Sequence, residues 1–262
     1  MKLHRLILGR FSLCLAVLAL LSTPGSASAS ADEGDAEARQ AREVLARADR
    51  IRFPEEGFQV DITITTTTPD NEPEVRAYRI LSKGNDQTLV QTTAPAVDRN
   101  QILLMREHDL WAFLPNLSQP IRLPLSQRLT GQVANGDLAR ANFVGDYTPR
   151  ILRTEKVDGE SHHVLELTAV DNWVTYHRVL YWVNARNSRP HKAEFYTLSG
   201  RLLKTCHYQK FKPMGGGVRP TILVIDDALR AGNRSVLEYA NMAERDLPDK
   251  IFTKDYLKKL SR

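Results

Sequence analysis

The chain has 262 residues, 42% of them hydrophobic and 26% charged, and a formal net charge of +5. Three of its 36 Lys and Arg lie within residues 1–31, where none of its 31 Asp and Glu occurs, so the formal charge without that segment is +2. So small an excess, with no basic run beyond the tail at 254–262, argues against nucleic acid as a partner.

The first residues have the pattern of an export signal. Three basic residues within the first ten are followed by an apolar stretch from Phe11 to Leu21, and then by two overlapping A-x-A cleavage patterns within 27–31. The apolar stretch is shorter than the roughly 20 residues that span a bilayer, so a retained membrane anchor is the less favoured alternative. Cys14 lies inside this stretch rather than after it, which argues against lipidation. We predict a signal peptide over residues 1–31 and a single mature domain over 32–262, outside the cytoplasm.

Residues 35–52 are predicted to form a helix, because Ala, Arg, Glu and Gln dominate them. Their apolar side chains recur at three- and four-residue steps and so fall on one stripe. This stripe consists of Ala38, Ala41, Val44, Leu45, Ala48 and Ile51. Pro54 ends the helix, which can cover a sheet or plug a barrel.

From residue 58 onward the hydrophobic period changes to two. Phe58, Val60, Ile62 and Ile64 alternate with polar residues, which is typical of a half-buried strand. Turn signals then separate a series of similar segments, so we expect an antiparallel meander. The expected strands are 58–65, 75–82, 88–93, 101–106, 110–114, 151–156, 164–169, 174–183, 192–197, 202–211, 221–226 and 235–243. With a short terminal helix at 252–260, the fold class is mainly β with a few helices (α+β).

The segment from Leu125 to Phe143 interrupts this series. It has no strand alternation, Gly131 and Gly136 are flexible points within it, and Asp137 can cap a short helix beginning at Leu138. A long stretch without strands inside a β domain is often functional, as a lid or a binding loop.

Signals for catalysis or metal binding are scarce. The chain has no G-x-S-x-G elbow, P-loop or H-E-x-x-H motif. His162 and His163 are adjacent on a strand and so point to opposite faces, which keeps them from sharing one ion. Cys206, the one cysteine after residue 31, lies in an apolar strand pattern and is expected to pack as a small hydrophobe. We therefore expect no enzyme, no catalytic residues, no metal and no cofactor.

Several predicted strands are apolar on both sides, and aromatic residues are prominent in them. The aromatic residues are Trp111, Phe113, Tyr181, Trp182, Phe195 and Tyr196. A strand that is apolar on both sides needs a cover on each face. From the residues alone, the second cover is either more protein or a ligand, since a curved sheet of this size can enclose a cavity.

Particular segments resemble the outer-membrane lipoprotein-sorting protein family of the LolA/LolB superfamily. They are DLWAFLPN at 109–116, PIR at 120–122 and SQRLTGQVANGDLAR at 126–140, with YHRVLYWV at 176–183 and AEFY at 193–196 fitting as well. The resemblance covers nearly the whole mature chain. It implies a curved, antiparallel, unclosed β-barrel with helices covering its concave face, and acyl chains held between them.

On this resemblance, the groove and its lid would be lined by hydrophobic side chains from the sheet and from residues 125–143. The candidate residues are Val60, Ile62, Ile64, Ile80, Leu104, Trp111, Phe113, Leu125, Leu129, Val133, Leu138, Phe143, Leu180, Trp182 and Phe195. Arg128 and Arg140 flank the lid and are candidates for a latch, although surface pairing is the favoured interpretation for both.

The resemblance implies a non-enzymatic periplasmic carrier that shuttles acyl chains of lipoproteins or lipids towards the outer membrane. Its expected partner is an inner-membrane exporter of the resistance-nodulation-division type. Two alternatives stay open: a periplasmic lipid-sensing regulator of similar fold that binds a membrane signalling partner, and a lipid hydrolase.

Overall fold

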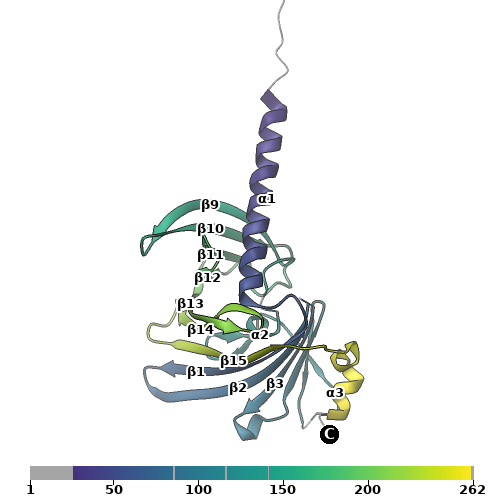
Figure 1. The fold of residues 1–262 in the computed structure, drawn as a ribbon. Coiled ribbons are helices and arrows are strands. Elements are labelled where there is room, and N and C mark those ends of the chain that lie inside the picture. The colour runs from purple at the N-terminus through teal and green to yellow at the C-terminus, as the bar shows by residue number, and fades with distance from the viewer. Residues whose placement is uncertain (1–25, 85, 116, 141, 261–262) are drawn as a thin grey trace, which may run out of the picture.

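A computed structural model describes residues 26–260 except 85, 116 and 141, and all structural statements refer to these residues. Thirteen strands form one antiparallel sheet in the order β6-β5-β4-β3-β2-β1-β15-β14-β13-β12-β11-β10-β9. The sheet curves around the end of helix α1 (Ser26–Arg52) but does not close, because β6 and β9 at its two edges do not pair (Figure 1). This is the mainly β, unclosed architecture that the sequence resemblance implies.

Most strands are long and follow one another as hairpins, as the alternating pattern predicts. In the first half they are β1 (Phe58–Thr68), β2 (Asn71–Lys83), β3 (Gln87–Ala94), β4 (Ile102–Arg106), β5 (Asp109–Phe113) and β6 (Ile121–Leu123). In the second half they are β9 (Tyr147–Val157), β10 (Glu160–Ala169), β11 (Arg178–Asn184), β12 (Pro190–Tyr196), β13 (Leu202–Met214), β14 (Gly217–Asp227) and β15 (Arg234–Glu244). The pairing of β1 with β15 joins the two halves into one sheet.

Helix α1 enters the concave side of the sheet with its C-terminal end. It packs against β9, β12 and β14, and Figure 1 shows its N-terminal part extending away from the sheet. Ala41, Val44, Leu45 and Ala48 are buried, which confirms the core of the predicted apolar stripe. The helix begins at Ser26, before the predicted start at 35. No helix in the described part of the chain is long and apolar enough to cross a membrane.

The segment between β6 and β9 lies across the concave face. It contains a two-stranded hairpin of β7 (Arg128–Thr130) and β8 (Val133–Ala134), followed by the short helix α2 (Asn135–Ala139). The sequence pattern misses the hairpin, because two- and three-residue strands are too short to show an alternation. The predicted helix is present, although it begins at Asn135 rather than at Leu138. Residues 125–143 are called the lid segment below.

Apolar side chains form two separate clusters on the two faces of the sheet. The larger one, called the concave cluster, joins α1, the lid segment and inward-facing residues of most strands. The smaller one lies under the chain end, where η2 (Asp249–Phe252) and α3 (Lys254–Leu260) cover the outer face of β3 to β5. A third short turn, η1 (Ala96–Asp98), follows β3. Strands β3 to β5 are therefore covered by protein on both faces.

Candidate functional site

The lid segment is packed into the concave face by its apolar side chains. Leu125, Val133, Leu138 and Phe143 are all buried within the concave cluster. Helix α2 contacts β3 and β4, and the N–H of Gln132 donates to Ser235 Oγ of β15 at 3.0 Å. The segment thus spans the concave face from one strand group to another, as a lid over a groove would.

One end of the lid segment is held by the end of helix α1. Asp49 Oδ2 accepts the backbone N–H of Phe143 at 2.7 Å and that of Val144 at 2.8 Å. The Asp49 side chain is only 7% exposed, and this burial raises the pKa of its carboxyl group, against the opposing effects of Arg52 and the two N–H groups. Hydrogen bonds to a charged acceptor contribute about 1.5–3 kcal/mol each, so this clamp is a substantial part of what keeps the lid segment in place.

Arg52 lies one helical turn further and is buried among aromatic rings. Its guanidinium carbon is 4.5 Å from the ring centroid of Phe143, 5.4 Å from that of Phe53 and 5.6 Å from that of Tyr208. Its Nη1 donates to Asp49 Oδ1 at 3.3 Å, and the guanidinium also interacts with the hydroxyl of Tyr181. Helix α1 therefore places a cation inside the concave cluster, under the lid.

The middle of the lid segment is held by a second buried charge pair. Lys204 of β13 contacts Asp137 Oδ2 at 2.5 Å and also donates to the carbonyl oxygen of Gln132 at 3.0 Å. Asp137 accepts the hydroxyl of Tyr176 at 2.9 Å and the backbone N–H of Ala134 at 2.8 Å. The Lys204 side chain is 6% exposed and that of Asp137 14%. Asp137 thus ties helix α2 to the sheet as well as capping it.

A third pair closes the C-terminal end of the lid segment. Arg140 forms two hydrogen bonds of 2.6 Å with the carboxylate of Asp146, and its Nη1 donates to the carbonyl oxygen of Glu107 at 2.8 Å. The side chains of Arg140 and Asp146 are 8% and 5% exposed. The favoured sequence interpretation of Arg140 as a surface pair is therefore wrong, whereas Arg128 is exposed.

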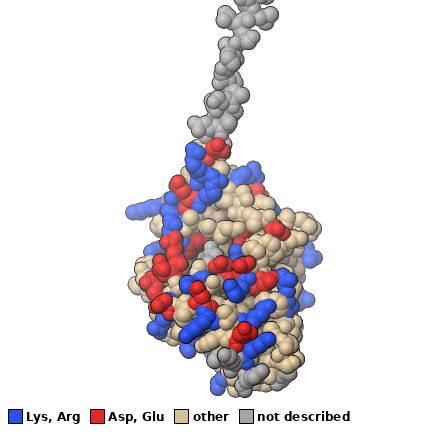
Figure 2. Space-filling view, turned by 90° about the vertical axis from the view of Figure 1, so that its right-hand side faces the viewer, with Lys and Arg blue, Asp and Glu red and all other residues tan. Residues whose placement is uncertain are grey.

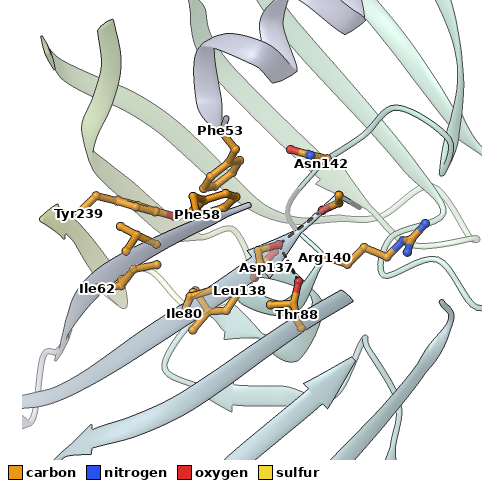
Figure 3. A pocket seen from close by; sticks show the side chains of 14 residues that line it. Phe53, Phe58, Ile62, Ile80, Thr88, Asp137, Leu138, Arg140, Asn142 and Tyr239 are labelled. Atoms are coloured by element: carbon orange, nitrogen blue, oxygen red, sulfur yellow. Dashed lines mark hydrogen bonds between the residues drawn. The ribbon is translucent and has the colours of Figure 1, made fainter. Parts of the chain in front are cut away.

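Two small cavities flank the lid segment. The first has a volume of about 20 Å³ and is bounded by Phe58, Ile62, Ile80, Leu138 and Tyr239, among others. Figure 3 shows these apolar side chains on one side of the cavity and Asp137, Arg140 and Asn142 on the other.

The second cavity has a volume of about 40 Å³ and is bounded by Arg52, Phe143, Tyr176, Lys204, Tyr208 and Leu237, among others. Ligand pockets usually measure about 300–1,000 Å³, so neither cavity can hold an acyl chain. Around these two cavities the protein's own side chains fill the concave face, while more open grooves of about 160 Å³ and 460 Å³ lie beside the lid hairpin and between α1 and β9.

The structure brings ten of the fifteen predicted groove and lid residues to this site. Val60, Ile62, Ile64, Ile80, Leu125, Val133, Leu138, Phe143 and Phe195 belong to the concave cluster, and Leu129 packs against it.

The other five lie elsewhere. Leu104 and Phe113 belong to the cluster under α3, and Trp111 packs against it, with Lys254 Nζ 3.0 Å from its ring centroid. Leu180 and Trp182 alternate with Val179, Tyr181 and Val183, which are the β11 residues in the concave cluster. Trp182 instead donates from Nε1 to Glu155 at 2.5 Å and faces Lys192. Because alternate residues of a strand face opposite sides of the sheet, Leu180 and Trp182 lie on the outer face.

Sequence reasoning named Asp137 as a helix cap and Arg140 as a latch candidate, but it missed the other charged residues of the site. Asp49 and Arg52 follow Leu45 and Ala48 at steps of four, so they continue the buried stripe of the helix. A charged residue at such a position is a usable signal for a buried pair. Lys204 has no comparable signal, since strand alternation does not separate a buried lysine from an exposed one.

The histidines and the cysteine weighed for metal binding or reactivity make packing and hydrogen-bond contacts. The ring of His162 lies near that of His191, with centroids 5.0 Å apart and the planes tilted by 56°. His163 contacts Thr154 and lines a groove beside α1, so the two adjacent histidines face opposite sides as predicted. Among the described residues, no group of three or more His, Cys, Asp or Glu is placed to hold a metal ion. Cys206 is buried in the concave cluster, and burial raises the pKa of its thiol to about 12.

Comparisons with known proteins place this geometry in context. A family model described as "Uncharacterized protein" matches residues 84–259. A LolA superfamily protein from Nitrosomonas europaea is similar in structure with a TM-score of 0.80 and 57% sequence identity, over 82% of this chain and 98% of that one. A search of curated proteins found no match.

Two more distant structures share the fold. An outer membrane lipoprotein-sorting protein domain from Vibrio parahaemolyticus has a TM-score of 0.73 at 22% identity, over 84% of this chain and 99% of that one. A DUF1329 family protein from Desulfovibrio piger has a TM-score of 0.74 at 19% identity, over the same shares. On the identity and coverage of the Nitrosomonas structure, this chain belongs to the LolA superfamily.

Proposed function

We propose that this protein is a periplasmic carrier that binds acyl chains of lipoproteins or lipids on the concave face of its sheet and moves them towards the outer membrane. The observation that carries the proposal is the lid segment, which covers an apolar concave face and is held there by a few polar contacts. A core built for stability alone would not need three buried charge pairs, because well-packed apolar residues are usually at least as stable.

The free energy gained by burying an acyl chain is close to the free energy lost when the lid segment leaves the concave face. Each buried methylene is worth about 0.8 kcal/mol, so a hexadecyl chain gains on the order of 12 kcal/mol in a dry groove, before ordering costs. Cargo must first displace the four buried apolar side chains of the lid segment, each worth about 1.5–3 kcal/mol. The two quantities are of similar size, so the lid offsets most of the gain and leaves an affinity from which cargo can be released.

Removal of a signal peptide is compatible with the way helix α1 packs on the sheet. We propose that residues 1–31 are removed as a signal peptide and that residues 32–262 act as one lipid-binding domain. Removal would take away the first six residues of α1, while its packed residues begin at Ala41, well beyond the cleavage site.

We further propose that cargo reaches the carrier from an inner-membrane exporter of the resistance-nodulation-division type. This partner is implied by the family resemblance. The charged surface is mixed: on the face in Figure 2, acidic and basic side chains are interspersed.

Native mass spectrometry of the protein purified from its own periplasm, followed by lipid extraction, tests the carrier proposal. We expect a mass shift that matches a lipid or an acylated peptide. A ligand-free mass that stays unchanged after incubation with phospholipid vesicles would contradict it and would favour a regulator that binds a membrane protein.

A further inference from the structure

Arg52 is less completely paired than the other buried cations of the site. Arg140 has a two-bond pair with Asp146 at 2.6 Å, and Lys204 contacts Asp137 at 2.5 Å. Arg52, in contrast, has one 3.3 Å hydrogen bond to Asp49 and a weaker interaction with the hydroxyl of Tyr181. The nearer contacts of Asp49 go to the backbone of the lid segment, so this carboxylate is shared between Arg52 and the lid.

A guanidinium group has five N–H donors in a planar fork, which suits a carboxylate or a phosphate. Around Arg52, aromatic rings occupy much of the remaining space, and the ring of Phe143 from the lid segment lies nearest. Tyr181, Tyr208 and Tyr239 are also buried and interact electrostatically with Arg52. Burial lowers the pKa of Arg52, but these tyrosines and Asp49 raise it by more, so the side chain stays charged.

Opening of the lid segment would change this environment. It would move Phe143 away from Arg52 and would take two N–H groups from Asp49. The opened groove would then have apolar walls such as Leu223, Ile225 and Leu237. The donors of Arg52 would lie at one point of the wall, and the mutually paired charges Lys204–Asp137 and Arg140–Asp146 would also line it. Asp49 would still face Arg52 through one 3.3 Å contact, but an occupant without acceptors would leave most of the guanidinium donors without partners in a partly apolar surrounding, which is costly.

We propose that the groove binds acyl chains that carry an anionic head, a carboxylate or a phosphate, and that Arg52 binds this head beneath the lid segment. The inference rests on the proposed carrier function and narrows its cargo to a chemical class.

The test compares ligands that share one chain and differ in the head. The mature protein is incubated with equal amounts of hexadecanoate, hexadecyl phosphate and 1-hexadecanol at mildly alkaline pH, and the bound species are counted by native mass spectrometry. We expect each anion to be bound about tenfold more than the alcohol, which corresponds to about 1.4 kcal/mol. A preference for one anion over the other distinguishes carboxylate from phosphate as the natural head.

The variants then assign the preference to Arg52. The double variant Asp49→Asn, Arg52→Gln replaces the pair by uncharged side chains of similar shape, and its bound ratio of anion to alcohol should fall to about one while alcohol binding persists. Arg128→Gln, on the exposed face of the lid segment, is the matched control and should keep the wild-type ratio.

Equal binding of anion and alcohol by the wild-type protein would overturn the inference and leave the carrier function standing. A double variant that keeps the preference would also overturn it. If the double variant does not fold, the wild-type ratio alone decides. Failure of all three ligands to bind would contradict the carrier function itself.

Discussion

Asp49 and Phe143 are 94 residues apart in sequence, and the carboxylate of Asp49 accepts the backbone N–H of Phe143 at 2.7 Å. This contact fastens the lid segment to the end of helix α1, close to where Arg52 enters the concave cluster. The helix is therefore both a cover of the sheet and a clamp on the lid. If the lid opens as a unit, the strength of this clamp sets how often it does so.

Loss of the clamp should open the lid segment more often. In Asp49→Ala, Phe143 and Val144 lose their acceptor, at a cost of about 1.5–3 kcal/mol for each bond, so the open population should rise by well over tenfold. Cys206 is buried under the lid and is the one cysteine of the predicted mature chain, so its alkylation rate under native conditions reports this opening. Glu43→Ala, at an exposed position of the same helix, should leave the rate unchanged.

Local opening and global unfolding are separable in that experiment. Opening of the lid exposes little surface, so the alkylation rate should depend only weakly on low urea concentrations. A steep urea dependence in both proteins would show that Cys206 reacts only from the unfolded chain and would contradict a mobile lid.

The effects of substituting Lys204 and Asp137 on the free energy of unfolding should be strongly coupled. Lys204→Met leaves the Asp137 carboxylate buried without its cation, and we expect a loss of about 3–5 kcal/mol in the free energy of unfolding. Adding Asp137→Asn removes the stranded charge while keeping an acceptor for Tyr176 and Ala134, so the double variant should regain at least half of the loss. Lys83→Met, which breaks the exposed pair with Asp249, should cause no measurable change. Strictly additive effects of the two buried substitutions would refute the coupling.

Gly131, in the turn of the lid hairpin, should not tolerate a side chain. Gly131 has a φ of +49°, and a Cβ there would lie 2.2 Å from Thr66 Oγ1 and 2.4 Å from Ser235 Oγ. Gly159→Ala is a matched control, because Gly159 also has a positive φ but no atom within 4 Å of its Cβ position. Urea unfolding should show Gly131→Ala to be less stable than Gly159→Ala by on the order of 1–3 kcal/mol. Equal losses would mean that the lid hairpin is not docked on β1 and β15.

Stability should fall at mildly acidic pH because of histidines on the outer face. Burial, with help from His162 and His207, lowers the pKa of His191 below its usual 6.5, and burial also lowers that of His207. The unfolded chain then binds protons that the folded chain does not, so their contribution is complete above pH 6.5 and is lost as the pH drops from there towards the lowered values.

The free energy of unfolding, measured against pH, checks this directly. The double variant His191→Gln, His207→Gln should have a flatter profile between neutral pH and pH 5–6, whereas His177→Gln, at an exposed position, should keep the wild-type slope. An unchanged slope in the double variant would assign the pH dependence to other groups.

The sequence predicts the architecture better than the interior of the site. Alternation from Phe58 to Ile64 and the stripe from Ala41 to Ala48 each have one buried face, so their periods identify it. Residues 179–183 are apolar throughout, and the pattern does not tell whether Tyr181 or Trp182 faces inward. Leu104 and Phe113 were predicted to line the groove but lie on the outer face. Both faces of their strands are apolar because α3 covers the outer one. The buried partners of Asp49 and Lys204 come from distant segments, which no local pattern reveals.

The central claim is that an acyl chain occupies the concave face beneath the lid segment. A hexadecanoate with a diazirine in mid-chain, photolysed on the mature protein and mapped by peptide mass spectrometry, tests it most directly. We expect adducts on concave residues such as Ile80, Phe143 and Leu237, and their loss when excess unlabelled hexadecanoate is present. Adducts confined to the outer-face residues Leu180 and Trp182, or to Trp111 under α3, would contradict it.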